Sequence, residues 1–433
     1  MKTLLKSDFL IISLMLFSMF FGAGNFIFPP MVGKEAGDNL YQAILFFCMT
    51  AVALPVLGIA AVARSKSLDN LVNRVDKVFA LTFTVLVYIT IGPLLAIPRA
   101  ASMPYEVSLA PIVGDNLLFI YSVIYFIANY LVCINKTTMI DAIGKWMAPI
   151  MLILIFVLFV ASLINPMGEF GISSQRYASN PMSSGFLDGY QTMDAMASLV
   201  FGIVVINAMK NIGIKNEKHL VSATIKSGIL AGIILMSIYM ALSYLGASSA
   251  TLSPDTKNGA SILSSVTTYL FGYYGKFILG AIFLLACFTT TVGLVSSASD
   301  YFSSLLPKLK YKFWVFLWCF LSLFMTNLGL DGILTYSIPI LSSFYPVSIM
   351  LIILALMNNY IESSKLIYRV CVYVTLMVSI VYSLENTGAN IESLSNLFRF
   401  IPFYDIGLGW IIPALACFCV TYIIFILQKK GNY

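Results

Sequence analysis

Apolar stretches of about 20 residues recur from one end of this chain to the other, and they restrict its fold more than any other feature. A helix of that length crosses the ~30 Å hydrocarbon core of a bilayer. Of the 433 residues, 60% are hydrophobic and only 10% are charged, whereas soluble domains carry roughly 25% charged residues. So few charges cannot cover a surface in water. The chain is therefore predicted to be an integral membrane protein whose outer surface contacts membrane lipid.

The predicted fold is all-α, because backbone groups inside lipid must bond within a helix or a closed barrel, and the alternating segments of barrel strands do not occur here. The pattern predicts about 12 transmembrane helices in a single domain over residues 1–433. Two outer connections, 166–189 and 247–271, are rich in Ser, Gly, Asn and Pro and are expected to be loops. The expected spans lie near residues 8–32, 40–63, 78–98, 116–135, 146–165, 190–209, 222–246, 272–298, 313–330, 333–357, 366–383 and 405–427.

Basic residues are distributed unevenly over the two ends of these spans. With the N-terminus inside, the outer side holds 6 of the 25 Lys and Arg residues and the cytoplasmic side holds the other 19. This bias obeys the positive-inside rule and predicts that both termini are cytoplasmic. It also accounts for the net charge of +6, so no nucleic-acid partner is expected. The first apolar run has no small-residue cleavage site and is expected to remain as a span.

The first expected span is interrupted at mid-membrane depth by Gly22-Ala23-Gly24-Asn25. The sixth carries Gly202 at a comparable depth, and the five spans between them make the two helices cross in opposite directions. Paired interruptions of this kind indicate the binding site of a secondary transporter. A glycine in a membrane helix can instead mark close helix packing. That alternative is weaker for the first span, because packing does not need the polar Asn25, and it stays open for Gly202.

Several motifs, in order along nearly the whole chain, resemble those of bacterial branched-chain amino acid:cation symporters, the BrnQ-type or LIVCS family. Met103-Pro104 departs from the family pattern, in which an aromatic residue is expected at the second position, and this puts the start of that outer loop in doubt. The matching motifs are Gly22–Asn25 with Ile27–Gly33, Gly92–Leu94 with Pro98-Arg99, Met193–Ala195 with Phe201–Asn207, Asn258–Ala260, Ala286-Cys287 with Val292–Leu294, and Asn327–Leu330.

The resemblance implies an organisation similar to the leucine-transporter superfold. Two inverted five-helix repeats would cover about 8–165 and 190–357, with broken helices 1 and 6 and extra helices at about 366–427. It also implies import of leucine, isoleucine and valine across a bacterial cell inner membrane, driven by a cation. The competing hypothesis is a proton-coupled permease for another small neutral amino acid or a nucleobase.

A zwitterionic substrate needs donors for its carboxylate, acceptors for its ammonium and an apolar slot for its side chain. A half-helix that starts near Gly24 would offer free N–H groups to the carboxylate. Carbonyls and apolar side chains of the sixth span would hold the rest. Tyr88 would either cap the carboxylate or be an ordinary buried tyrosine. The expected substrate-binding residues are Gly22, Ala23, Gly24, Asn25, Tyr88, Phe201, Gly202, Ile203 and Val204.

A run of three threonines in the eighth span suggests the coupling ion, because sodium prefers oxygen ligands. The resemblance maps its ligands onto the hydroxyls of Thr289 and Thr290 and the carbonyls of Ala286, Ser18 and Phe21. The hydroxyls could instead bond to their own helix. Sodium is favoured over protons, because the middle of the fifth span carries no titratable residue. No other cofactor is expected.

Two charged residues, Arg99 and Asp194, lie near the outer side of the expected site. A carboxylate inside a membrane is a functional candidate by default, and the two are predicted to pair in an outer gate. The alternative is that a watery vestibule simply hydrates them. An enzyme is not expected, because the single histidine, His219, lies in a cytoplasmic loop and no paired carboxylates or metal-ligand spacings occur. A channel is disfavoured because inverted halves suit alternating access.

Overall fold

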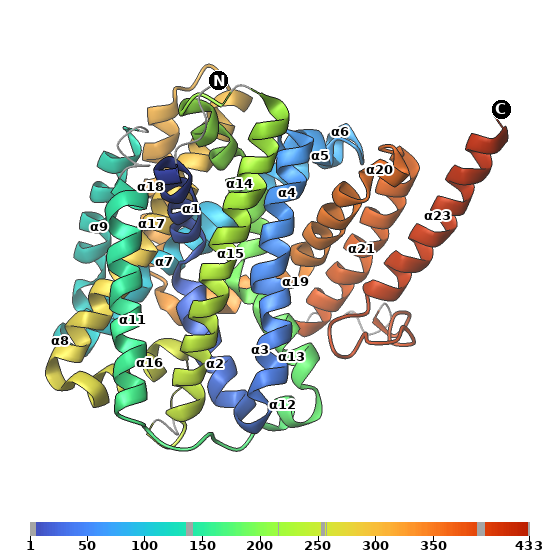
Figure 1. Cartoon of the computed structure of the whole chain (residues 1–433). Coiled ribbons are helices and arrows are strands. Elements are labelled where there is room, and N and C mark those ends of the chain that lie inside the picture. Colours follow the sequence, from blue (N-terminus) through green and yellow to red (C-terminus); the bar gives the residue numbers. More distant parts are fainter. Residues whose placement is uncertain are drawn as a thin grey trace.

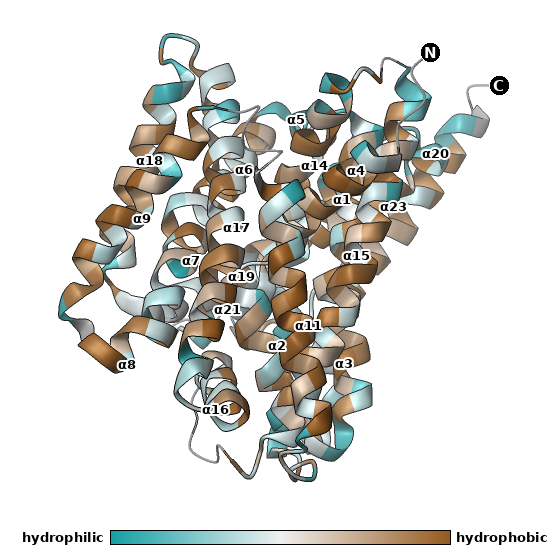
Figure 2. Cartoon of the chain, turned by 60° about the vertical axis from the view of Figure 1, so that its left-hand side comes forward, coloured by the Kyte–Doolittle hydropathy of each residue, from teal (hydrophilic) through white to brown (hydrophobic). Residues whose placement is uncertain are grey.

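Helix is the only regular secondary structure that the computed structural model shows in its described residues, which are 6–135, 142–214, 216–252, 256, 258–387 and 395–431. Hydrophobic residues fill the middle of the bundle and hydrophilic ones gather toward its two ends (Figure 2). Within the described residues, nine helical stretches are long and apolar enough to cross a membrane, and three shorter apolar helices accompany them. The all-α membrane fold is confirmed, while the count of twelve spans stays a prediction.

The first half of the chain contains one interrupted helix, α1 and α2, and one bent helix, which turns at Gly92 and Pro93 within η3. The elements are α1 (Lys6–Phe20), α2 (Ala23–Ala36), η1 (Gly37–Asn39), α3 (Leu40–Cys48), η2 (Met49–Ala53), α4 (Leu54–Ser65), α5 (Leu68–Val72), α6 (Lys77–Ile89), η3 (Thr90–Leu94), α7 (Ala96–Pro104), η4 (Tyr105–Leu109), α8 (Ala110–Val113), η5 (Asp115–Leu117), α9 (Leu118–Cys133), η6 (Ala142–Met147) and α11 (Ala148–Ile164).

The second half contains the two longest helices, α15 and α17, which together span most of the bundle's height (Figure 1). The elements are α12 (Gln175–Ser179), α13 (Pro181–Asp188), η7 (Gly189–Thr192), α14 (Asp194–Asn211), α15 (Glu217–Ser248), α16 (Gly259–Phe271), η8 (Gly272–Tyr274), α17 (Gly275–Leu305), α18 (Tyr311–Thr326), α19 (Gly329–Leu356), α20 (Asn358–Ile361), α21 (Lys365–Asn386) and α23 (Ile411–Gly431).

The sequence predicts that the two outer connections are loops, but both contain helices. The segment 166–189 contains α12 and α13, and the segment 247–271 contains α16. Helix α16 begins at Asn258, whose Oδ1 accepts a hydrogen bond of 2.9 Å from the N–H of Ser261. Such a cap satisfies an amide that would otherwise have no partner. Residues 253–255 and 257 of the second connection lie outside the described residues.

Helices α1, α2, α14, α15 and α17 form the centre of the bundle. Helix α15 packs along both α1 and α2, while α17 packs against α7 and α1. Helix α23 lies at one edge beside α21, and its end points the same way as the beginning of α1 (Figure 1). The interruption between α1 and α2 is therefore surrounded by helices from distant parts of the sequence.

Candidate functional site

The first-span interruption lies where the sequence predicts it. Helix α1 ends at Phe20 and α2 begins at Ala23, with Gly22 in an extended conformation between them. The Gly22 N–H donates to Oδ1 of Asn25 over 2.8 Å, which fixes the start of α2. The Asn25 N–H bonds back to the Gly22 carbonyl over 3.2 Å, and the amides of Ala23 and Gly24 precede this first bond of the helix. The predicted free N–H groups at the start of this half-helix are therefore those of Ala23 and Gly24.

The sixth-span interruption lies earlier than predicted. Helix α14 runs unbroken through Gly202, and the chain instead breaks at Met193, between η7 and α14, where φ is 68°. A Cβ added at Gly202 would lie 2.7 Å from Cγ1 of Val62 on α4. This glycine therefore allows two helices to pack closely, which is the alternative that the sequence left open. Because the backbone of α14 continues as helix here, the carbonyls of Ile203 and Val204 are not freed by a break.

The two interruptions are joined by hydrogen bonds around one carboxylate. Oδ2 of Asp194 accepts from Nδ2 of Asn25 over 2.7 Å and from the hydroxyl of Tyr239, on α15, over 2.9 Å. Asn25 and Tyr239 also contact each other. All three side chains are buried. Sequence reasoning missed Tyr239, since a single tyrosine in an apolar span gives no signal of which neighbour it faces.

Arg99 approaches the first-span interruption from α7. Its Nη1 donates to the carbonyl of Gln191 over 3.0 Å, while its Nε has no hydrogen-bond partner. A Cβ added at Gly24 would lie 2.5 Å from Nη2 of Arg99, so the guanidinium rests against the glycine backbone. Between the described side chains of Arg99 and Asp194 there is no ion pair within 4.0 Å. Their direct pairing is absent here, and their role as a gate stays a prediction.

Arg99 and Asp194 are the only charged residues that are buried among the described side chains, each 2% exposed. Both line one cavity of about 30 Å³ between the two interruptions. A charged residue inside a membrane protein is costly, so two opposite charges at one cavity make this cavity the candidate functional site. We call them the charged pair. The cavity lining is completed by Met19, Phe20, Gly22, Ala23, Gly24, Asn25, Ile91, Ala96, Ala100, Thr192, Met193, Ala197, Phe201, Thr290 and Leu294.

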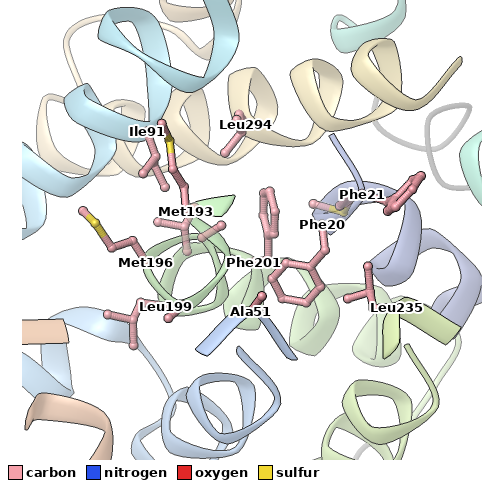
Figure 3. Packing of buried hydrophobic residues seen from close by; sticks show 14 of the residues in the cluster. Phe20, Phe21, Ala51, Ile91, Met193, Met196, Leu199, Phe201, Leu235 and Leu294 are labelled. Atoms are coloured by element: carbon pink, nitrogen blue, oxygen red, sulfur yellow. The ribbon is translucent and has the colours of Figure 1, made fainter. Parts of the chain in front are cut away.

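Of the predicted substrate-binding residues, Gly22 to Asn25 and Phe201 line this cavity. Phe201 meets the ring of Phe20 edge to face, at 5.5 Å between ring centres, and Figure 3 shows both rings in the buried cluster. Gly202, Ile203 and Val204 are not in the lining.

Tyr88 does not reach the cavity in this conformation. Its ring stacks on Tyr301 of α17 at 4.4 Å between centres, and Tyr301 is about three turns along that helix from Thr290. The ordinary reading of Tyr88 as a buried tyrosine describes this packing. The third span reaches the cavity through Ile91 and through α7 instead.

Oxygen atoms from α1 and α17 gather behind the first-span interruption. Oγ1 of Thr289 lies 3.0 Å from the Ser18 carbonyl, 2.9 Å from the Ser18 hydroxyl and 2.9 Å from the Ala286 carbonyl. Oγ1 of Thr290 lies 3.4 Å from the Ser18 carbonyl. We call these atoms the oxygen cluster. Four of the five residues predicted to hold the ion therefore lie together, and the role of the Phe21 carbonyl stays a prediction.

The cluster has the chemistry of a site for a hard cation. All its atoms are neutral oxygens, the ligand type that such ions take in proteins. The Ser18 hydroxyl donates to Oγ1 of Thr289, and the hydroxyls of Thr289 and Thr290 donate to carbonyls. The third threonine, Thr291, is engaged elsewhere, since its hydroxyl lies 2.9 Å from that of Tyr125.

Comparison with known proteins gives a consistent result. A sequence profile described as "Branched-chain amino acid transport protein" matches residues 5–428. The branched-chain amino acid permease BraB of Bacillus subtilis is 40% identical over 96% of this chain and 95% of its own length. The permease BrnQ of the same organism is 37% identical over the whole of both chains, and BrnQ of Escherichia coli K12 is 34% identical over 94% and 93%. These relatives are permeases, in agreement with the prediction that the chain is not an enzyme.

Solved structures show the same fold. Mhp1, a nucleobase-cation-symport-1 family transporter, in a closed conformation with bromovinylhydantoin bound, aligns with a TM-score of 0.64 over 98% of this chain and 93% of its own. The inward-facing conformation of Mhp1 aligns with a TM-score of 0.59 over 96% and 90%. The identities are 14% and 13%, so the likeness concerns the fold alone, and it confirms the predicted fold class.

Proposed function

The chain belongs to the branched-chain amino acid transport protein family, and from this premise we propose that it imports leucine, isoleucine and valine across a bacterial inner membrane together with sodium. The relatives' names support the substrate class. They also disfavour the competing hypothesis of a carrier for another neutral amino acid or a nucleobase. The choice of ion rests on the oxygen cluster.

The observation that carries the proposal is the charged pair in one cavity. A guanidinium binds a carboxylate through two parallel N–H groups, and a buried carboxylate binds an ammonium through a charge-assisted bond. Arg99 has an unpartnered Nε, and Asp194 lies across the same cavity. A zwitterion placed between them would meet a complementary charge at each end. The first amides of α2, beside Gly24, would add donors for its carboxylate.

The aliphatic side chain would then face the apolar part of the lining, which includes Phe20, Ile91, Phe201 and Leu294 (Figure 3). The cavity of about 30 Å³ is far below the roughly 300–1,000 Å³ of typical ligand sites. Substrate entry therefore requires the walls to separate. Because the walls belong to α1, α7, α14 and α17, that movement would open one face of the site at a time, as alternating access requires.

Sodium would bind at the oxygen cluster and bring its own positive charge. The ion would replace the hydroxyl protons as the partner of the Ser18 carbonyl. Thr289 could then direct its proton to the Ala286 carbonyl, 2.9 Å away. The cluster touches the interruption itself, since a Cβ added at Gly22 would lie 2.9 Å from Oγ1 of Thr290. Binding of the ion would thus stabilise the conformation in which α2 presents its amides.

Proton coupling is the second candidate, because Asp194 is a titratable group at the site. The test is uptake of radiolabelled leucine into proteoliposomes with an imposed sodium gradient or an imposed proton gradient. We expect accumulation with sodium, and none with protons alone. Accumulation that depends on the proton gradient and does not depend on sodium would show that protons are the coupling ion, with Asp194 as the group that carries them. Absence of uptake for leucine, isoleucine and valine under both gradients would reject the substrate class.

A further inference from the structure

Six basic side chains line a cleft of about 1180 Å³ that shares no lining residue with the cavity between the interruptions. The cleft lies at the end of the bundle where α4, α14 and α15 come together near α5 and α20 (Figure 1). We propose that it binds the head group of an anionic phospholipid from the membrane leaflet at that end. The basic residues are Arg64, Lys66, Arg74, Lys210, Lys218 and Lys226.

The protein itself supplies little negative charge to this cleft. Glu217 is the one acidic residue in the described lining, and it pairs with Lys66 over 2.9 Å. Arg74 donates to two neutral hydroxyls, of Tyr368 over 2.8 Å and of Ser65 over 3.2 Å.

The other four cations have no side-chain hydrogen bond or ion pair within the part of the chain that the structure describes. Like charges gathered at the edge of a low-dielectric region repel one another and attract a diffusible anion. With six cations against one carboxylate, the described lining has an excess of five positive charges, which anionic lipid head groups of one negative charge each would partly offset. The four are Arg64, Lys210, Lys218 and Lys226.

The lining favours a lipid over a soluble anion because apolar side chains accompany the basic ones along α15. Lys218 and Ile229 both line the cleft from α15 and lie roughly 16 Å apart along its axis. Ile229 is 47% exposed and Ile225 is half-buried, so the lining around them offers apolar surface to an acyl chain. A soluble phosphate would use only the basic part.

The position of the cleft also fits this ligand. Most of the chain's basic residues belong to the end of the bundle that the positive-inside rule assigns to the cytoplasm. The cytoplasmic leaflet carries anionic lipids, and basic pockets between membrane helices on that side bind their head groups. The inference does not depend on the proposed transport mechanism, and its test does not measure transport.

The test compares thermal unfolding of the purified full-length protein in neutral detergent after addition of phosphatidylglycerol, phosphatidylcholine or soluble glycerol 3-phosphate at equal concentrations. A ligand at about 100 times its Kd stabilises the folded state. We expect phosphatidylglycerol to raise Tm by about 3–5 °C more than either of the other two. The triple variant Arg64→Gln/Lys210→Gln/Lys226→Gln should lose most of that difference.

A matched triple variant, Lys308→Gln/Lys310→Gln/Lys312→Gln, removes three charges from the connection between α17 and α18 and from the first turn of α18, outside the cleft, and should keep the full shift. Equal shifts with the two lipids, or an equal loss in both triple variants, would overturn the proposal. A shift with glycerol 3-phosphate as large as that with phosphatidylglycerol would replace the lipid by a soluble anion. If the cleft variant is unstable in phosphatidylcholine, native mass spectrometry can instead count the phosphatidylglycerol molecules that stay bound to wild type and to Lys226→Gln. We expect fewer bound lipids on the variant. Equal numbers would reject the site.

Discussion

The first-span interruption faces two different surroundings. On the side of α7 and α14, the start of α2 meets the charged pair, Arg99 and Asp194. On the side of α17, the end of α1 meets the oxygen cluster, whose atoms are all neutral. The two regions are only a few residues apart along the chain, yet one uses full charges and the other uses none.

The difference between the two regions corresponds to the charges of their proposed ligands, the amino acid and sodium. A zwitterion has both charges and no net charge, so a fixed pair of opposite charges can hold it without changing the total. A cation brings a charge of its own, and neutral oxygens can bind it without adding a buried anion that would need a partner when the ion leaves. The two regions therefore suit cycles of loading and unloading in a low-dielectric site.

The largest effect should come from filling the space that Gly24 leaves for Arg99. In Gly24→Val, the new side chain would displace Nη2 of Arg99 and press on the carbonyl of Gln191, 3.2 Å from the added Cβ. We expect leucine uptake to fall by at least about 100-fold, because a misplaced binding group at a preorganised site is costly. Amounts of protein in the membrane should stay near those of wild type.

Gly228→Ala on α15 is the control, because its added Cβ would lie 3.3 Å from Ile59 and outside the cavity. It should transport at close to the normal rate. Normal uptake by Gly24→Val would show that Arg99 is not part of the substrate site. The contrast between the charged pair and the oxygen cluster would then no longer hold.

A smaller but still large effect is expected for Asp194→Asn. The amide keeps the shape of the side chain and loses its charge, so the ammonium would lose a buried ionic partner, an interaction worth roughly 2–5 kcal/mol. The KM for leucine should rise by about 100-fold in uptake assays at saturating sodium. The same substitution at Asp188, which bonds to Arg176 and Tyr177 away from the cavity, should leave KM within about twofold.

This pair of variants also separates binding from gating. If Asp194 acted only in an outer gate, the rate of uptake would change while the KM for leucine stayed normal. If neither quantity changed, the charged pair would have no part in transport.

Substitutions in the oxygen cluster should change the sodium dependence of uptake and not the KM for leucine. Thr289→Val removes one of its hydroxyls at almost constant volume, and one lost oxygen ligand is worth about 1.4 kcal/mol or more. The sodium concentration for half-maximal uptake should rise by about tenfold, with little change in leucine KM once sodium is saturating. Thr291→Val, which removes the hydroxyl bonded to Tyr125, should not shift the sodium dependence. Equal behaviour of the two variants would argue against the cluster as the ion site.

The sequence was sufficient for the first interruption because its chemistry is local: two glycines and Asn25 lie within four residues. The sixth-span interruption could not be found in the same way. Met193 has no local reason to adopt a positive φ, and distant contacts of Asp194 with Asn25 and Tyr239 accompany it. Non-glycine residues reach such conformations only where the surrounding structure holds them.

The sequence also does not show which face of each helix is turned toward the site. Composition and periodicity show that a span exists, but not which side chains face a given neighbour several helices away. For Tyr88 the sequence leaves open a carboxylate cap and an ordinary buried tyrosine, and the ring is found stacked on Tyr301. For Tyr239 it gives no signal at all. The capping pair Asn258 and Ser261 did carry a local signal for α16, which the polar composition of that connection concealed.

The smallest expected effect concerns Gly202, and it tests whether this glycine differs in kind from Gly24. In Gly202→Ala, the methyl group would lie 2.7 Å from Val62, and overpacking of this sort costs about 1–3 kcal/mol. We expect Tm to fall by a few degrees while leucine KM stays within about twofold. Val62→Ala should restore part of the lost stability in the double variant, because the two side chains share one contact. A large rise in KM without loss of stability would instead return Gly202 to the recognition site and make the two glycines equivalent.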